Sequence, residues 1–112
     1  RGVSENLQQV GSLVRISNDV RRKTIEDFSW LPIRNQDVVY LRDSLFTGSS
    51  SSALLKLKNG TELRISANSL ITLNQNGDEL VLDLKFGDLS ANLAANTKLS
   101  IKSGEEVSEV EN

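Results

Sequence analysis

The strongest constraint on the fold is a regular alternation of apolar and polar residues that is interrupted by Asn-Gly pairs. Between residues 53 and 57 every second residue is Ala or Leu, and the pattern resumes over residues 63–65, after Asn59-Gly60. A period of two is that of a half-buried strand, whereas a helix repeats every 3.6 residues. Asn-Gly between two such runs predicts a β-hairpin with a type I′ turn, which needs positive φ at both central residues.

Further short apolar runs on both sides of this hairpin predict more strands. In the run 80–86, the three leucines and Phe86 are expected to share one face, with Asp83 and Lys85 on the wet face. We expect the other strands at residues 10–16, 30–33, 70–73, 89–93 and 98–102, with turns at Asn18-Asp19, Asn76-Gly77 and Gly87-Asp88.

A weak internal repeat adds a hint about how these strands are arranged. Asp43-Ser44, Asn68-Ser69 and Asn96-Thr97 each place an Asp or Asn and a hydroxyl before an apolar strand, at intervals of about 25 to 28 residues. Such a period is typical of stacked coils, although coincidental turn chemistry explains it about equally well. The sequence therefore predicts an all-β chain of short antiparallel strands, in a β-solenoid-like or a compact sandwich or roll arrangement.

The length of 112 residues suits one domain. Residues 1–9 are expected to be a lead-in beside a membrane anchor that lies upstream, residues 10–103 the β domain, and residues 104–112 an acidic tail or linker that frays. Hydrophobic residues make up 38% of the chain but aromatic ones only 4%. We therefore expect a core of Leu, Ile, Val and Ala.

The residue types needed for most catalysis are absent. Without His or Cys, the chain lacks the commonest general base, metal ligand and thiol nucleophile. We predict no catalytic residue, no metal site and no cofactor; a carboxylate pair in a deep pocket would be the only route to an enzyme. The net charge of −2 argues against nucleic-acid binding. No apolar run reaches the 18 residues of a membrane span.

Four residues are candidates for contact with a partner. Trp30 is interpreted first as a packing residue, and otherwise as an exposed contact for a protein or a sugar. Tyr40 is the other side chain that offers a stacking face to a polysaccharide. Arg21 and Arg22, with Lys23, form the one basic cluster, which is usually a solvated loop. An unpaired edge strand offers a further surface for protein binding.

The order of several short motifs resembles that of the FecR domain family. Its members show Gly-Asp-x-(Ile/Leu)-x-Thr-Gly, an Asp-Gly-(Ser/Thr) turn, a Pro-Asn-Ser segment and a closing Leu-x-x-Gly-x-(Leu/Val). Here these correspond to residues 42–48, 59–61, 67–69 and 84–89, and the resemblance covers roughly residues 10–102. Arg42, Asn59 and Ala67 replace the family's Gly, Asp and Pro. The signature positions are Asp43, Thr47, Gly48, Asn59, Gly60, Asn68 and Gly87.

The resemblance implies a bacterial domain on the outer side of the cytoplasmic membrane, with no catalytic residues. We therefore expect a periplasmic or extracytoplasmic module, tethered to the inner membrane, that binds or senses a protein partner or acts as a scaffold in a regulatory protein. The alternative is a cell-envelope module that binds peptidoglycan or another polysaccharide.

Overall fold

The computed structural model describes residues 8–111, and every regular element in that range is a β-strand. No helix in this range is long and apolar enough to cross a membrane. The lead-in expected at residues 1–9 lies almost entirely outside the described residues. The strands are β1 (Gln9–Ser17), β2 (Val20–Lys23), β3 (Leu31–Pro32), β4 (Val38–Tyr40), β5 (Ser44–Thr47), β6 (Ser52–Leu57), β7 (Glu62–Ile65), β8 (Ser69–Asn76), β9 (Glu79–Phe86), β10 (Leu89–Asn92), β11 (Lys98–Ser103) and β12 (Glu106–Glu111).

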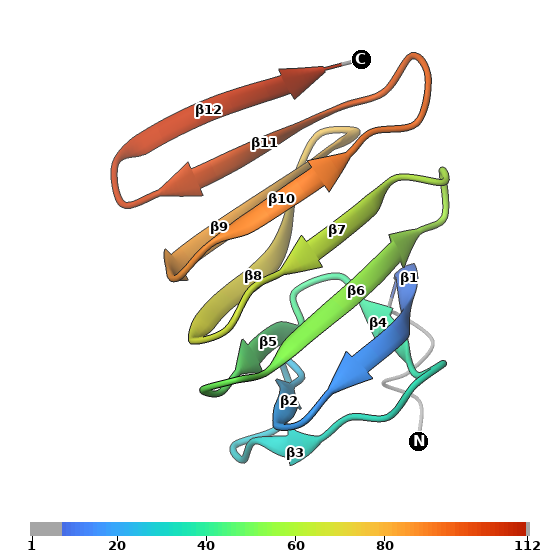
Figure 1. Cartoon of the computed structure of the whole chain (residues 1–112). Helices are drawn as coiled ribbons and strands as arrows, with labels where there is room; N and C mark the ends of the chain where they lie inside the picture. Colours follow the sequence, from blue (N-terminus) through green and yellow to red (C-terminus); the bar gives the residue numbers. More distant parts are fainter. Residues whose placement is uncertain (1–7, 112) are drawn as a thin grey trace.

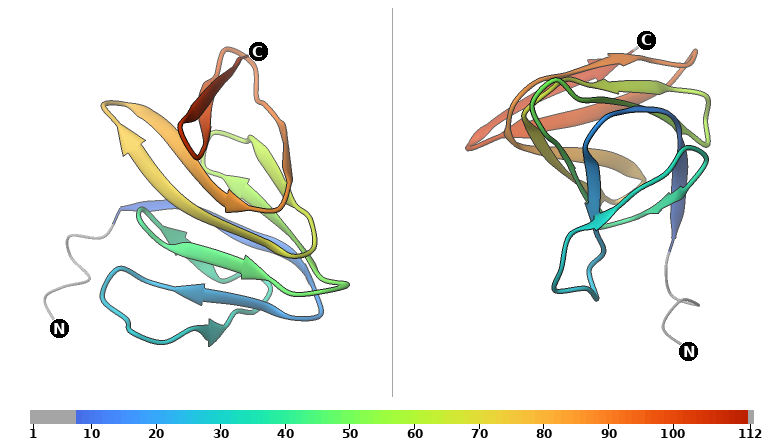
Figure 2. Two further views of the ribbon diagram at one scale, coloured as in Figure 1. Left: turned by 90° about the vertical axis from the view of Figure 1, so that its left-hand side faces the viewer. Right: turned by 60° about the horizontal axis from the view of Figure 1, so that its bottom comes forward.

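The strands form two sheets that pack face to face. A five-stranded sheet has the order β10-β7-β6-β1-β4, and a seven-stranded sheet has the order β12-β11-β9-β8-β5-β2-β3. The pairs are antiparallel except β9 with β11, which run parallel. Figures 1 and 2 show the two layers, with β1, β6 and β7 in front in the first view. The all-β prediction is confirmed, and of the two arrangements the sandwich fits, because the strands do not close into a solenoid.

The core between the sheets is aliphatic. The alternation predicted around the Asn59-Gly60 hairpin is confirmed, because its five apolar positions over residues 53–65 are all buried. A buried aliphatic side chain contributes roughly 1.5–3 kcal/mol relative to an exposed one, so this layer supplies the main driving force for folding. The buried hydrophobic residues are Leu13, Val20, Ile33, Val39, Leu45, Ala53, Leu55, Leu57, Leu63, Ile65, Ile71, Leu73, Leu82 and Leu99.

The hairpin turn at Asn59-Gly60 differs from the prediction. Only Gly60 has a positive φ, of 96°, and its N–H donates to the carbonyl of Leu57 at 3.0 Å. The Leu57 N–H donates to the carbonyl of Thr61 at 2.8 Å. This is a three-residue loop in which a turn over residues 58–59 is followed by a left-handed glycine, so the type I′ prediction is wrong. The side chain of Asn59 instead accepts the Thr61 N–H at 2.9 Å.

The internal repeat corresponds to left-handed corners and not to stacked coils, although the left-handed residue precedes Asp43 in the first unit and is the Asn itself in the other two. Arg42, Asn68 and Asn96 all have positive φ, at 75°, 55° and 61°, and each lies one or two residues before a strand. The strands that follow two of these corners, β5 and β8, are antiparallel neighbours. Asn suits the left-handed region because its short polar side chain can bond nearby backbone, whereas Arg there is strained.

The acidic C-terminal segment does not fray as expected. Residues 106–111 form β12, which pairs with β11 over its whole length. Val110 packs against the core from this strand, while Val107 remains 61% exposed. Four glutamates suggest a solvated tail, but Gly104, with a φ of 63°, makes a tight hairpin turn that brings them back along β11.

Candidate functional site

A row of large side chains crosses the outer face of the seven-stranded sheet. The register places Arg21 on β2 opposite Phe46 on β5, Phe46 opposite Leu70 on β8, and Leu70 opposite Phe86 on β9. Directly opposed residues on neighbouring strands share a face and contact one another. Trp30, just before β3, completes the set, and we call Arg21, Trp30, Phe46, Leu70 and Phe86 the aromatic row.

The aromatic row lines a groove of about 350 Å³. Trp30 is 37% exposed and Phe86 49% exposed. The rings of Trp30 and Phe46 lie 6.2 Å apart between centroids and are tilted by 59°, a favourable geometry for an aromatic pair. The row is therefore held in place by its own packing while its rings remain open to solvent.

The contrast with the core is sharp. The chain has three Phe, one Trp and one Tyr, yet the buried core contains none of them. Phe46, Phe86 and Trp30 lie in the aromatic row, and Phe28 is 97% exposed in the loop between β2 and β3. Large apolar side chains gathered outside a core are typical of an interaction surface. The interpretation of Trp30 as a core packing residue is wrong, because it packs on the outside of the sheet.

Phe86 illustrates why the row was missed in the sequence. Alternation with the leucines of β9 predicted that Phe86 shares their face. The structure pairs Ile71 with Leu84 but Leu70 with Phe86, so Lys85 is an extra residue in β9. Such a β-bulge reverses the facing of the residues beyond it, and it turns Phe86 outward. Phe46 and Leu70 carried no signal of their own, because only the register of β5 and β8 brings them together.

Arg21 supplies the positive charge of the groove. Its Nε donates to Asp19 Oδ1 at 2.9 Å, and the two side chains are 50% and 46% exposed. Within residues 8–111, no hydrogen bond uses its two terminal nitrogens. The guanidinium is thus oriented by one weak surface ion pair, and within the described residues its terminal N–H groups are left without a hydrogen-bond partner.

Arg22, the neighbouring candidate contact, has a different role. Its Nε donates to Asp43 Oδ2 at 3.2 Å, and a terminal nitrogen donates to the carbonyl of Val38. The side chain of Asp43 is 2% exposed and that of Arg22 18%. The hydrogen bond to Val38 joins β2 of one sheet to β4 of the other, and the ion pair holds the corner after β4, so the charge of Arg22 is used inside the fold.

Burial governs the chemistry of Asp43. Loss of solvent raises the pKa of Asp43 above its ordinary value of 3.8, and the N–H of Tyr40 and the guanidinium of Arg22 only partly offset this effect. Asp43 is therefore a structural carboxylate at the corner between β4 and β5, where water does not reach it.

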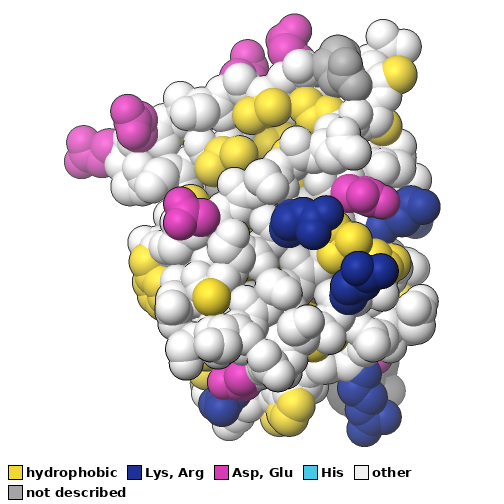
Figure 3. Space-filling model, viewed as in Figure 1, with side chains coloured by type: hydrophobic (Ala, Val, Ile, Leu, Met, Phe, Trp, Pro, Cys, Tyr) yellow, Lys and Arg dark blue, Asp and Glu magenta, His cyan; other side chains and the backbone are white. Residues whose placement is uncertain are grey.

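Tyr40, the remaining candidate contact, lies in β4 of the other sheet, where it is half-buried and pairs with Gln9. It does not join the aromatic row. The outer face of the five-stranded sheet, seen in Figure 3, carries charged side chains over β6 and β7. Leu54 and Lys56 lie there opposite Arg64 and Glu62. Over β6 and β7 this face is a solvated, charged surface, while Figure 3 also shows hydrophobic side chains grouped toward the C-terminal strands.

The positions on which the FecR-like resemblance rests lie at or beside corners of the fold. Thr47 Oγ1 donates to the carbonyl of Ser66 at 2.6 Å and accepts the Ser69 N–H at 3.0 Å. Gly48 bonds Asp19 and Asn68 through its backbone. Gly87, with a φ of 92°, lies so close to Ser69 that a Cβ would meet its Oγ at 2.1 Å. Together with Asp43, Asn59, Gly60 and Asn68, these residues hold the fold and leave no reactive group exposed for chemistry.

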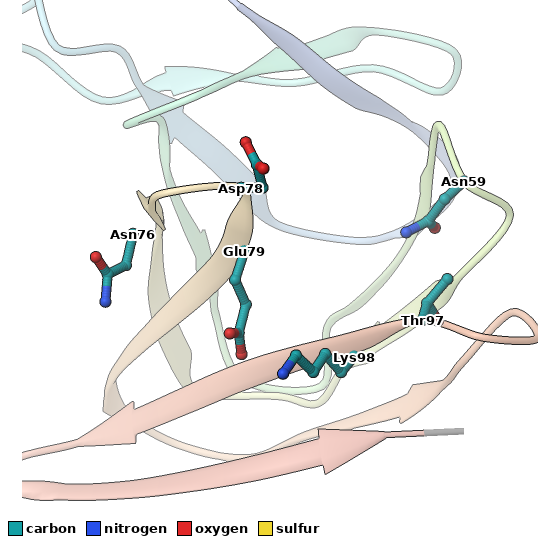
Figure 4. A pocket seen from close by; sticks show the side chains of 6 residues that line it. All are labelled: Asn59, Asn76, Asp78, Glu79, Thr97 and Lys98. Carbon is teal, nitrogen blue, oxygen red and sulfur yellow. The ribbon is translucent and has the colours of Figure 1, made fainter.

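A second hollow, of about 460 Å³, lies where three turns meet at one end of the sandwich. Its polar groups are partly used within the fold, because Glu79 accepts the Ser100 hydroxyl at 2.7 Å. Figure 4 shows side chains around a wide opening, without an aromatic platform. Among residues 8–111, no three Asp, Glu, His or Cys side chains gather to hold a metal. The lining residues are Asn59, Asn76, Asp78, Glu79, Thr97 and Lys98.

The aromatic row is the better candidate site. It combines aromatic faces with one exposed guanidinium and contains no acid, base or nucleophile for a chemical step. It can hold a ligand by apolar contact and by charge. Comparison with protein-family models, with curated proteins and with solved structures finds no match to this chain.

Proposed function

We propose that this chain is a non-catalytic protein-binding module that uses the aromatic row as its contact surface. The observation that carries the proposal is the placement of the aromatic residues: all of the Phe and Trp side chains lie outside the core, and three of the four line one groove. Trp, Tyr and Arg are the residues most enriched in the energetic centres of protein interfaces. Large apolar rings that are exposed to water without a partner favour aggregation, so their exposure here fits a binding surface.

The cellular setting is proposed from the FecR-like order of motifs. It favours an extracytoplasmic module in a membrane-anchored bacterial regulator, where the row would bind or sense a protein in the periplasm or envelope. A polysaccharide ligand is less well supported, because a sugar site combines aromatic faces with several polar partners, and among residues 8–111 the groove is lined by a single polar residue, Arg21.

The test compares capture of envelope proteins by the wild-type chain and by the variant Phe46→Thr/Phe86→Thr. Thr suits an exposed strand position, so this variant removes two rings at little expected cost to the fold. Val107→Thr is the matched control, because Val107 is an exposed apolar residue on the same sheet, outside the row. We expect a protein that is retained by the wild type and the control and is lost from the double variant.

Binding to purified peptidoglycan is measured with the same three proteins. Row-dependent sedimentation with peptidoglycan, together with no row-dependent protein capture, would overturn the proposal in favour of an envelope-polysaccharide module.

A further inference from the structure

We infer that the aromatic row recognises an extended peptide segment in which apolar side chains alternate along one face and a carboxylate lies at the Arg21 end. This inference rests on the proposed protein-binding function and adds the chemistry of the partner. It depends on three features of the groove: its length, its width and its charge.

The length of the row suits a short segment. From Arg21 on β2 to Phe86 on β9, the row crosses four neighbouring strands. Strands lie about 4.8 Å apart, so this stretch of the row is roughly 14 Å long. An extended chain rises about 3.3 Å per residue, so about four residues span this stretch and about two of their side chains point into it.

The width of the row favours an extended chain over a helix. On one side, the next outward positions are Lys23, Ser44 and Thr72, which are polar and lie opposite one another in the register. On the other side, β5 ends one residue after Phe46 and β8 begins one residue before Leu70. Across β5, β8 and β9 the apolar strip is thus one residue wide. A helix about 10 Å across would cover the polar row as well, whereas an extended backbone fits the strip.

The charge of the groove selects a carboxylate. Arg21 is the only ionisable residue that lines it, and its terminal nitrogens make no hydrogen bond within residues 8–111. Its ion pair with Asp19 is half exposed and therefore contributes little energy. The same contact nevertheless orients the plane of the guanidinium. A planar guanidinium beside aromatic rings binds a carboxylate through two parallel N–H donors, and a lysine ligand would be repelled there.

The experiment begins with a phage library of random 12-residue peptides, selected on the immobilised wild-type chain. Clones whose binding is lost on Phe46→Thr/Phe86→Thr define row-dependent peptides. We expect these to carry two or three apolar residues at alternate positions and to be enriched in Asp or Glu beside them. Selection on Arg21→Glu is expected to enrich Lys or Arg instead.

A synthetic copy of one selected peptide then tests the charge contact directly by fluorescence anisotropy. Replacing its Glu by Gln, or its Asp by Asn, is expected to weaken binding to the wild type about tenfold and to leave binding to Arg21→Gln unchanged. Lys23→Gln is the matched control, because Lys23 lies two residues away on the same face of β2. It should bind both peptides as the wild type does.

The outcomes separate the two proposals. Row-dependent peptides without an acidic preference, or a preference that Lys23→Gln removes as completely as Arg21→Gln does, would overturn this inference and leave the proposed protein binding intact. Failure to select any row-dependent peptide would count against both.

Discussion

Arg21 and Arg22 are neighbours in the chain but act in opposite parts of the molecule. Because side chains alternate along a strand, Arg21 points out of the seven-stranded sheet and Arg22 points toward the other sheet. The outward pair with Asp19 is about half exposed, whereas the inward pair joins Arg22 to an Asp43 side chain that is 2% exposed. Two adjacent basic residues that look like one cluster in the sequence thus have different roles within a strand. Arg21 is available for recognition, and Arg22 stabilises the fold.

The largest effect is expected from Arg22→Met. The change removes the guanidinium but keeps most of its length, so Asp43 becomes a buried carboxylate without its cation and the carbonyl of Val38 loses a donor. Breaking a buried ion pair in this way costs about 3 kcal/mol of unfolding free energy at neutral pH. Urea denaturation followed by fluorescence of Trp30 or by circular dichroism measures it.

The loss of unfolding free energy in Arg22→Met should also depend on pH. Without Arg22 the pKa of Asp43 rises further, so the carboxyl protonates more readily in the folded state and the destabilisation becomes smaller as the pH falls toward 4. A destabilisation that is equal at pH 4 and pH 7 would show that the variant acts only through lost packing.

Arg42→Gly is expected to stabilise the corner that holds Asp43. Arg42 has a φ of 75°, where a residue with a side chain is strained by about 1–2 kcal/mol, and glycine is not. The greater backbone freedom of glycine in the unfolded chain offsets part of the gain, so we expect an increase of about 0.5–1 kcal/mol in unfolding free energy. Asn68→Gly is the comparison, because asparagine already tolerates this conformation and the same change should gain less.

Asp43→Asn is expected to be milder than Arg22→Met, with a change below about 1 kcal/mol at neutral pH. Asparagine keeps an acceptor for the N–H of Tyr40 without burying a negative charge. Because the folded pKa of Asp43 is raised above 3.8, the folded state binds its proton more tightly than the unfolded state does. The stability from this group is therefore full below about pH 4 and is lost as the pH rises through the raised pKa.

Denaturation of the wild type and of Asp43→Asn between pH 3 and pH 7 tests the direction of this pH dependence. The stability of Asp43→Asn relative to the wild type should increase with pH over this range. A decrease would mean that the ion pair with Arg22 outweighs the burial of Asp43.

The smallest effect on stability is expected from Arg21→Gln. Its ion pair with Asp19 is exposed, and pairs of this kind contribute less than about 0.5 kcal/mol. A calorimetric melting temperature within about 2 °C of the wild type is the expected result. A loss comparable to that of Arg22→Met would remove the distinction between the two arginines.

The sequence was sufficient to predict the parts of the fold that follow from local pattern. Alternation over residues 53–65 identified a hairpin and its buried face. The internal repeat also identified Asn68, which has a positive φ at a corner of the fold. Local pattern was insufficient where a single residue alters which side chains face the core or where a strand begins. The extra Lys85 turned Phe86 outward, and Gly104 converted an apparent acidic tail into β12.

The candidate site was predicted only in part, for a related reason. Trp30 and Arg21 are predicted as candidate contacts from the sequence, but Phe46, Leu70 and Phe86 join them only through the register of β2, β5, β8 and β9. Register depends on turns and bulges along the whole sheet, so short-range pattern does not reveal a row that runs across the strands.

The most direct test of the account is the dissociation constant of a row-dependent acidic peptide, measured on Arg21→Gln and on folded Arg22→Met in parallel. The account predicts that Arg21→Gln weakens binding about tenfold, while Arg22→Met, although less stable, binds within about twofold of the wild type. Equal weakening by both variants, or weakening by Arg22→Met alone, would contradict the division between an outward arginine for recognition and an inward arginine for the fold.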